Sequence, residues 1–429
     1  MNNNPNKLIL LNRQFSSFWD GVTSTILSKK TGASKVTVCD LGRMRTVLLE
    51  VEKRPGHLFV HHLDIIKNAS QDQKPSLILK PFLDGKKFRK DGVRVALKGH
   101  GVVIRFIPFP KMKVDDLRSA MKYEAEQYIP FELNDVVLDC AVVEEALATD
   151  DGIKMEVMLV VIKRQELEPT LEIFRNLECR LSVVDVDILS AMAALEYFHP
   201  EDFSRHSGIL DLGTEISTLG IVRDGKPRFV RDISYGAYDL FKRFKTRSNL
   251  ADEKVEKLFE NNAAPTPDEM QAITESLEGL IRDLRVSFDY YHDQSGQAKP
   301  VSKLFLSGVV SHPAVLKVLS EGLQLPVVSM DILSKIKWDP GVDPELLKAN
   351  ASLLPVGPHP ASPGIGGSTG HPVPDGLRPR IVRQFVHQNG GRSGAAPSES
   401  PDASVVCADR KSTRLNSSHE IPSRMPSSA

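Results

Sequence analysis

Two short segments of the chain place an aspartate and a glycine where one strand-like run ends and the next begins. The first is Asp40-Leu41-Gly42 and the second, much later in the chain, is Asp211-Leu212-Gly213. Glycine lets the N–H groups of a turn approach an anion closely, and an aspartate can hold a hydrated Mg²⁺ that bridges phosphate oxygens. Two such turns facing one another would clamp a phosphate group.

A third glycine stands in a comparable place. Gly308 follows the strand-like run Lys303–Leu306 and precedes a helix that we expect to begin near Pro313. Glycine at this turn would let a flat base or a ribose pack against the backbone at the start of a helix. The alternative is that these are ordinary turns that need glycine for their conformation. We predict a nucleotide site made of Asp40, Gly42, Asp211, Gly213 and Gly308, with Asp40 and Asp211 as the metal ligands.

The segments that must position these turns alternate between strand-like and helix-like patterns. Between residues 36 and 198 we interpret VTVCDL, TVLLEV, HLFVHHL, SLILKPFL, VRVAL and VVIRFIPF as strand-like runs, followed by a helix over Val114–Tyr128. In the second half, Asp224-Gly225 predicts a hairpin turn. A capping box at Thr266–Glu269 predicts the start of a helix that reaches about Tyr291. The pattern is typical of mixed α/β layers.

Charge and cysteine usage exclude several classes of protein. Lys and Arg number 55 and Asp and Glu number 55, so no long-range field would attract nucleic acid to the surface as a whole. The four cysteines contain no Cys-x-x-Cys pair and predict neither a disulfide framework nor a structural zinc site. No run is long and apolar enough to cross a bilayer, and no signal peptide is evident. We expect a reduced, cytosolic protein.

The order of these elements resembles that of the PilM family, actin-like cytoplasmic proteins of type IV pilus assembly. The resemblance covers roughly residues 36–356 and is most specific at EAEQYIPFELNDVVLD, residues 124–139. It implies an α/β, actin/Hsp70-like two-lobed ATPase fold with a small α/β subdomain inserted in the first lobe. The implied division is an N-terminal extension with an amphipathic helix (1–35), a first lobe (36–100 and 164–206), the inserted partner-binding subdomain (101–163), a second lobe (207–356) and a disordered or non-native tail (357–429).

The resemblance also implies a role. Such a protein binds the cytoplasmic tail of the inner-membrane protein PilN and couples it to the pilus motor platform. It would act at the cytoplasmic, inner face of the inner membrane and associate with that membrane only through its partners. Tyr128, Pro130 and Phe131 either line the groove that takes the tail or cap the core of the inserted subdomain.

The resemblance implies that Thr214 belongs to the second phosphate turn with Asp211 and Gly213, and that Gly308 forms the adenosine turn. Two departures from the family pattern bear on ATP and Mg²⁺. Arg43-Met44-Arg45 stands where relatives place small residues, and Gly308-Val309-Val310 stands where relatives have paired glycines. A β-branched residue does not readily adopt positive φ and would fill space that the base needs. We therefore expect a scaffold that binds ATP weakly or not at all, with no catalytic residues. The alternatives are an FtsA-like filament-forming ATPase at the membrane and an active sugar-kinase-like or Hsp70-like phosphotransferase.

Other chemistry-bearing residues favour structural roles. His57, His61 and His62 suggest metal binding, but an exposed strand is the better interpretation of their spacing. Asp185 and Asp187 stand two apart in a strand-like run, which places both on one face. A solvated pair at the end of a strand is favoured over a second role beside the magnesium.

Overall fold

The computed structural model describes residues 35–68, 75–85, 88–149, 152–260, 263–295 and 300–356. The amphipathic helix predicted before residue 35 and the tail predicted from residue 357 lie outside these ranges. Among the described helices, none combines the length and the apolar character that a membrane span requires.

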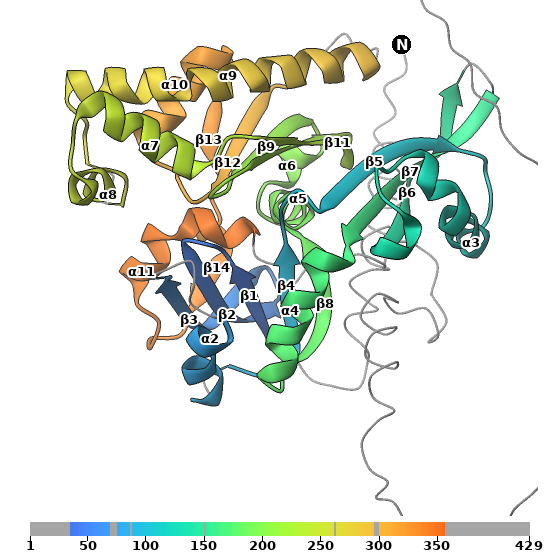
Figure 1. Ribbon diagram of the computed structural model, residues 1–429, viewed down its shortest axis with the longest axis horizontal. Helices are drawn as coiled ribbons and strands as arrows, with labels where there is room; N and C mark the ends of the chain where they lie inside the picture. The colour runs from blue at the N-terminus through green and yellow to red at the C-terminus, as the bar shows by residue number, and fades with distance from the viewer. Residues whose placement is uncertain are drawn as a thin grey trace, which may run out of the picture. The chain divides into compact units, whose positions relative to one another are not determined.

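The first lobe is built on a six-stranded sheet in the order β14-β3-β2-β1-β4-β8 (Figure 1). The strands β1, β2 and β3 form an antiparallel meander, whereas β4 and β8 run parallel to β1. The short β14 lies in the stretch predicted to belong to the second lobe, yet it pairs with β3 of this sheet. The bounds are β1 (Val36–Leu41), β2 (Arg45–Arg54), β3 (His57–Lys67), β4 (Asp91–Leu97), β8 (Arg180–Val186) and β14 (Ile336–Trp338).

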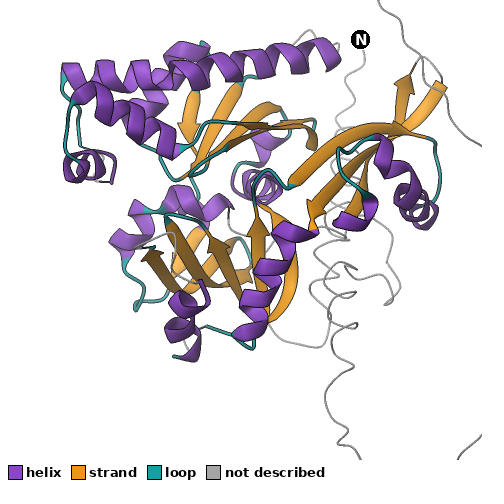
Figure 2. Cartoon of the chain, viewed as in Figure 1, coloured by secondary structure: helices purple, strands orange, loops and turns teal. Residues whose placement is uncertain are grey.

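Figure 2 shows the helices of this lobe beside its sheet, and their buried apolar residues join the sheet in one hydrophobic core. The helix that matters most for the site is α5, which begins directly where β8 ends. Its Met192 packs against Gly220 of the second lobe. A Cβ added to Gly220 would lie 2.4 Å from the Met192 methyl group. The helices are α2 (Pro75–Asp84), α4 (Arg164–Asn176), α5 (Asp187–Phe198), α6 (Pro200–Phe203) and α11 (Pro344–Ala349), with a 3₁₀ segment, η4 (Ala351–Val356), after the last.

The second lobe has a five-stranded sheet in the order β11-β10-β9-β12-β13. Here β9, β10 and β11 repeat the antiparallel meander of the first lobe, and β12 runs parallel to β9. The long α9 contributes a buried apolar stripe to the core of this lobe. The elements are β9 (His206–Leu212), β10 (Ser217–Arg223), β11 (Lys226–Ile233), α7 (Ala237–Ser248), α8 (Asp252–Glu260), α9 (Pro267–Ser295), β12 (Lys303–Gly308), α10 (Pro313–Leu323) and β13 (Val327–Ser329).

The inserted subdomain is a three-stranded antiparallel sheet, β5-β7-β6, with α3 packed on one face. Ion pairs join this sheet to the second lobe. Arg228 of β11 pairs with Glu156 at 2.6 Å and with Glu144 at 3.0 Å, and Lys226 reaches Glu144 at 2.7 Å. The elements are β5 (Val102–Phe109), α3 (Val114–Glu124), η1 (Ala125–Gln127), η2 (Leu133–Asp135), β6 (Val136–Thr149) and β7 (Gly152–Lys163).

Local sequence signals are confirmed at two places. Asp224 and Gly225 adopt φ values of 55° and 72° in the β10–β11 turn, as a tight hairpin requires. The capping box at the start of α9 is formed, because the Thr266 N–H donates to Glu269 at 2.7 Å and the Glu269 N–H donates to Thr266 at 3.3 Å.

The interpretation of SLILKPFL as a strand-like run is wrong, because these residues form α2. Leu79 and Leu83, four residues apart, are both buried, so the segment buries one helical face. Pro81 lies inside the helix without ending it. A short apolar run does not by itself distinguish a buried helix from a strand.

Candidate functional site

The structure brings the two predicted aspartates together around one lysine. Asp40 lies near the end of β1 and Asp211 near the end of β9, and each is nearly fully buried. Lys98, just after β4, lies with its Nζ 3.7 Å from Asp40 Oδ1 and 3.2 Å from Asp187 Oδ2. Asp211 also interacts electrostatically with this ammonium group. Three carboxylates from three segments therefore surround one cation.

The electrostatics of this group follow from burial and from its excess of negative charge. Burial, Asp40 and Asp211 raise the pKa of Asp187, and Lys98 only partly opposes them. Burial and Asp40 raise the pKa of Asp211 in the same way. Burial alone would lower the pKa of Lys98, but the surrounding carboxylates outweigh it and raise the pKa. The lysine is held in its charged form.

The fit of this site to a divalent cation depends on its carboxylate oxygens. Asp40 Oδ1 and Asp187 Oδ2 face the Lys98 ammonium group, whereas Asp187 Oδ1 and Asp211 Oδ1 are buried without a hydrogen-bond partner. Carboxylate oxygens are the donors that Mg²⁺ prefers. However, within the described ranges no three acidic, histidine or cysteine side chains converge closely enough to hold a metal ion. The residues do not fit a directly bound metal, and the hydrated Mg²⁺ assigned to Asp40 and Asp211 stays a prediction.

In the two predicted glycine turns, a backbone carbonyl group lies so close that it leaves no room for a side chain on the glycine. A Cβ on Gly42 would lie 2.5 Å from the Arg45 carbonyl oxygen, and one on Gly213 would lie 2.6 Å from that of Ile216. Each glycine thus lets its hairpin close on itself. Gly213 and Thr214 also accept hydrogen bonds through their carbonyls from Ala237 and Tyr238 at the start of α7. Their carbonyls hold the second turn against the second lobe.

Two arginines of the Arg43-Met44-Arg45 segment have partners outside the first turn. Arg43 forms an ion pair with Glu215 of the second turn, so the two turns are joined by their side chains. Arg45 donates a hydrogen bond to Asn350 at 2.8 Å, on the segment that follows α11. Asn68 supports the same turn by donating to the carbonyls of Gly42 and Arg43 at 2.7 and 3.1 Å.

Gly308 packs against the end of β9. Its φ is 102°, and a Cβ there would lie 2.4 Å from the Leu212 carbonyl oxygen and 2.6 Å from Asp211 Oδ1. Val310 is buried in the core of the second lobe, and Val309 is partly buried beside it. Neither valine has a positive φ. The glycine is needed here for strand packing beside Asp211, and a role toward adenosine stays a prediction.

Two members of the site were not assigned from the sequence. Lys98 stands in a polar turn with no motif around it. Asp187 was expected to form a solvated pair with Asp185, but both are buried, at 3% and 2% exposure, so that expectation is wrong. Asp185 Oδ2 accepts a hydrogen bond from Ser190, and Asp187 begins α5 and meets Lys98. The change from strand to helix between them sends the two carboxylates to different partners.

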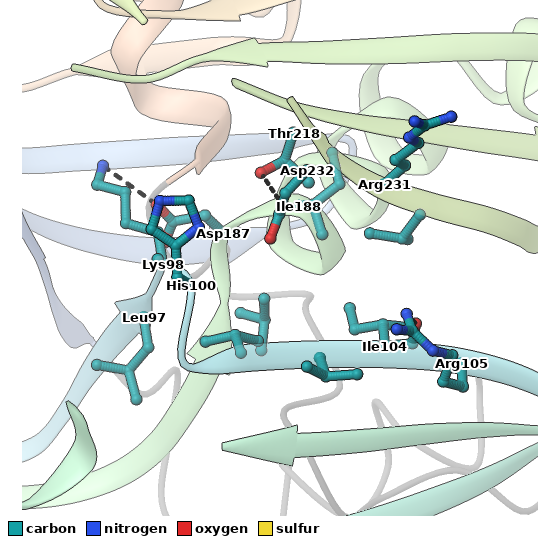
Figure 3. Close-up of a pocket in the computed structure, with 15 residues that line it drawn as sticks. Leu97, Lys98, His100, Ile104, Arg105, Asp187, Ile188, Thr218, Arg231 and Asp232 are labelled. Carbon is teal, nitrogen blue, oxygen red and sulfur yellow. Dashed lines mark hydrogen bonds and ion pairs between the residues drawn. The ribbon is translucent and has the colours of Figure 1, made fainter. Parts of the chain in front are cut away.

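A pocket of about 280 Å³ adjoins this group of charges (Figure 3). Lys98 and Asp187 lie at one end of it, beside His100. One wall is the start of β5, including Ile104 and Arg105, and the opposite wall comes from β10 and β11 of the second lobe. On that wall Thr218 donates a hydrogen bond to Asp232 at 2.9 Å. The pocket therefore lies where the inserted sheet meets the second lobe.

The residues predicted to bind a partner lie elsewhere on the inserted subdomain. Tyr128 and Phe131 are half-buried and pack on the cluster under α3, while Pro130 is exposed. The ammonium group of Lys163 lies 4.2 Å from the centre of the Phe131 ring. None of the three lines the pocket. Their assignment as partner-binding residues stays a prediction.

The histidines predicted to be structural have acidic neighbours across the meander. His61 lies 2.9 Å from Glu52, and His62 lies 3.9 Å from Glu50, both on β2. Burial alone would raise the pKa of Glu52, but hydrogen bonds with His61 and Arg54 outweigh it and lower the pKa. These contacts are pairwise ion pairs between neighbouring strands.

Two α/β lobes that each contribute an aspartate-bearing hairpin to one site, with a small sheet inserted in the first lobe, define a protein of the actin-like fold class. The model of the family described as type IV pilus assembly protein PilM matches residues 62–357, more than half of the chain. The chain therefore belongs to the PilM family. The matched range includes the second turn and begins after the first.

Among solved structures, the chain is similar to one titled PilM-PilN type IV pilus biogenesis complex, with a TM-score of 0.64 and 23% identity over 76% of this chain and 96% of that chain. It also matches ethanolamine utilization protein EutJ from Carboxydothermus hydrogenoformans, with a TM-score of 0.43 and 11% identity over 71% of this chain and 87% of that chain. A third match is the cytoplasmic domain of EpsL of the Vibrio cholerae type II secretion system, with a TM-score of 0.37 and 12% identity over 74% and 94%.

Proposed function

We propose that the chain is an adaptor that binds the cytoplasmic tail of a PilN-like inner-membrane protein and couples it to the pilus motor platform. It would lie in the cytoplasm at the inner face of the inner membrane and be held there by its partners. Membership of the PilM family and the similarity to a structure titled as a PilM-PilN complex support this proposal over a filament protein or a phosphotransferase.

The observation that carries the proposal is a strand edge beside a pocket. Within the described residues, β5 pairs with β7 alone, and its other edge faces β11 across the pocket without pairing with it. The start of this strand lines the pocket. Here the Ile104 carbonyl accepts a hydrogen bond from the side chain of its own neighbour, Arg105, at 3.0 Å. An extended peptide could replace that contact with main-chain hydrogen bonds along the edge of β5.

The pocket walls give such a peptide a place for its side chains. Basic groups come from both sides, with Arg105 on the inserted sheet and Arg231 on the second lobe. Because an added strand presents alternate side chains to one side, only every second residue of the peptide would enter the pocket. A tethered, extended segment suits this mode of binding, since it orders only when it binds.

Calorimetric titration of the full chain with a synthetic peptide tests the proposal. The peptide should carry the cytoplasmic residues of the PilN-like protein encoded beside this chain. We expect the double variant Arg105→Glu/Arg231→Glu to lose at least about tenfold in affinity, because charge reversal on both pocket walls adds repulsion and removes donors. Arg282→Glu, an exposed arginine on α9, is the matched control and should bind as the parent does.

The same titration separates the two candidate surfaces. If Tyr128→Ala weakens binding and the pocket variant does not, the peptide lies on the α3 side of the inserted subdomain. If the peptide binds neither with nor without Mg-ATP, the adaptor proposal fails.

We infer further that ATP and Mg²⁺ bind weakly or not at all. Lys98 already neutralises part of the negative charge between the two hairpins, and the Arg43–Glu215 pair joins the two turns where phosphate would lie. Titration with Mg-ATP should give a dissociation constant no tighter than about 10 µM. Phosphate release above a buffer control that Asp211→Ala abolishes would instead favour the phosphotransferase alternative.

A further inference from the structure

The segment that carries Lys98 connects two parts of the molecule. Residues 98–101 join β4 of the first lobe to β5 of the inserted sheet. Gly99 has a φ of 118° in this turn, and its carbonyl accepts a hydrogen bond from the Val102 N–H at 3.0 Å. The turn is thus a defined structure, and it directs the lysine toward the buried carboxylates.

The three carboxylates around Lys98 come from different parts of the chain. Asp40 belongs to the first sheet, Asp187 starts the helix after β8, and Asp211 belongs to the second sheet. Their exposures are 5%, 3% and 4%, so water does little to screen their mutual repulsion. Burying like charges without a counter-ion is strongly unfavourable. Either protonation of a carboxyl group or a nearby positive charge must offset this repulsion.

Lys98 supplies that charge. Its side chain is 29% exposed, and it is the cation that the structure places in contact with Asp40 and Asp187. The same described region does not gather the carboxylates into a metal site. We propose that Lys98 is a built-in counter-ion that takes the role of a bound cation beside Asp40 and Asp187 and stabilises these buried carboxylates in the absence of metal and nucleotide.

This proposal gives Lys98 a role that does not depend on partner binding or on ATP hydrolysis. It requires that the parent protein be equally stable with and without Mg²⁺. It also requires that removal of the lysine make the stability of the protein depend on an added cation, whereas the stability of the parent does not. A lysine that is only part of the packing would create no such need.

Thermal unfolding of the full chain in EDTA and in 10 mM MgCl₂ provides the test. We expect the midpoint of the parent to differ by less than about 1 °C between the two conditions. In EDTA, Lys98→Met should unfold at least about 5 °C lower, because it leaves three buried carboxylates without their counter-ion. MgCl₂ should recover a large part of that loss.

Lys90→Met is the matched control, because Lys90 directly precedes β4, just as Lys98 directly follows it, and pairs with Asp84 at 2.9 Å. It should shift the midpoint little and gain no response to Mg²⁺. Lys98→Met/Asp187→Asn tests the charge argument directly. Removal of one carboxylate should restore stability in EDTA relative to Lys98→Met.

The outcomes that overturn the proposal are equally definite. A parent whose midpoint rises by several degrees with Mg²⁺ would show that Lys98 does not replace the cation. A Lys98→Met variant that is as stable as the parent in EDTA would show that no counter-ion is needed. If Lys98→Met fails to fold and neither MgCl₂ nor Asp187→Asn rescues it, the lysine acts through packing and the proposal is wrong.

Discussion

The guanidinium group of Arg43 forms an ion pair with the carboxylate of Glu215, and this contact joins the two glycine turns of the site. The two residues belong to different lobes, each next to the aspartate-bearing strand of its own hairpin. Both side chains are more than half exposed, at 61% and 51%. The pair therefore lies at the surface, in contrast to the buried carboxylates of Asp40 and Asp211.

This position leads to a prediction about Glu215→Ala. We expect the free energy of unfolding to change by less than about 1 kcal/mol, since solvent screens an exposed pair. We also expect affinity for Mg-ATP to rise about threefold or more, because the freed guanidinium can meet a phosphate. Calorimetry and urea denaturation measure the two effects. Arg43→Ala, which removes the same pair without freeing a cation, is the control and should not bind ATP more tightly.

The ion pairs between β11 and the inserted sheet differ from this one in burial. Arg228 is 9% exposed, and it donates to both Glu144 and Glu156. Burial alone would raise the pKa of Glu144, but hydrogen bonds from Lys226 and Arg228 outweigh it and lower the pKa. These contacts hold the inserted sheet against the second lobe.

We predict that Arg228→Met lowers the free energy of unfolding by about 2–4 kcal/mol, because it leaves two partly buried carboxylates without their main partner. Hydrogen exchange should also become faster at the amides of β6 and β7. Arg247→Met removes a surface pair with Glu275 and should cost less than about 1 kcal/mol. Equal losses in the two variants would contradict the argument from burial.

The meeting of the two hairpins could be predicted from the sequence, whereas the cation between them could not. Asp40 and Asp211 each follow an apolar strand and precede a glycine, so the repeated pattern indicated two related halves that contribute to one site. Lys98 has no comparable signal. It stands in a short polar turn, and its role arises only when strands far apart in the sequence place three carboxylates around that turn.

The wrong local predictions have a common physical cause. SLILKPFL was interpreted as a strand because it is a short apolar run, and Asp185 and Asp187 were placed on one face because they are two apart in a strand-like run. In both cases a helix is present where a strand was expected, over Pro75–Asp84 and from Asp187 onward. Short apolar segments that are buried on several sides carry little periodicity, so tertiary packing decides their conformation.

A partly buried carboxyl group on α5 leads to a prediction of pH dependence. Burial raises the pKa of Glu196 to about 8, and Lys53 only partly opposes it. The folded state therefore binds this proton more tightly than the unfolded state, in which the pKa is near 4.5. The stabilisation is complete below that unfolded value and is lost as the pH rises toward and through about 8.

We expect Glu196→Gln to remove this pH dependence. Relative to the parent, the variant should gain about 2 kcal/mol in unfolding free energy between pH 5 and pH 9, a figure reduced to allow for partial solvent screening. Urea denaturation across that range measures the difference. Parallel curves for parent and variant would mean that Glu196 titrates in the folded protein as it does in the unfolded chain.

Two glycine substitutions should have opposite effects on stability. Gly308 has a φ of 102° and lies against the Leu212 carbonyl, so an added methyl group would meet both an unfavourable backbone conformation and a clash at 2.4 Å. Gly279, inside α9, has no atom within 4 Å of the place that its Cβ would occupy. We predict that Gly308→Ala destabilises the fold by about 2–4 kcal/mol. Gly279→Ala should stabilise it by about 0.5–1 kcal/mol, because alanine has the higher helix propensity. Urea denaturation of both variants gives the two values.

A Gly308→Ala variant as stable as the parent would contradict this argument. It would mean that the end of β12 can move away from β9, and that the close packing of this glycine beside Asp211 is not a requirement of the fold.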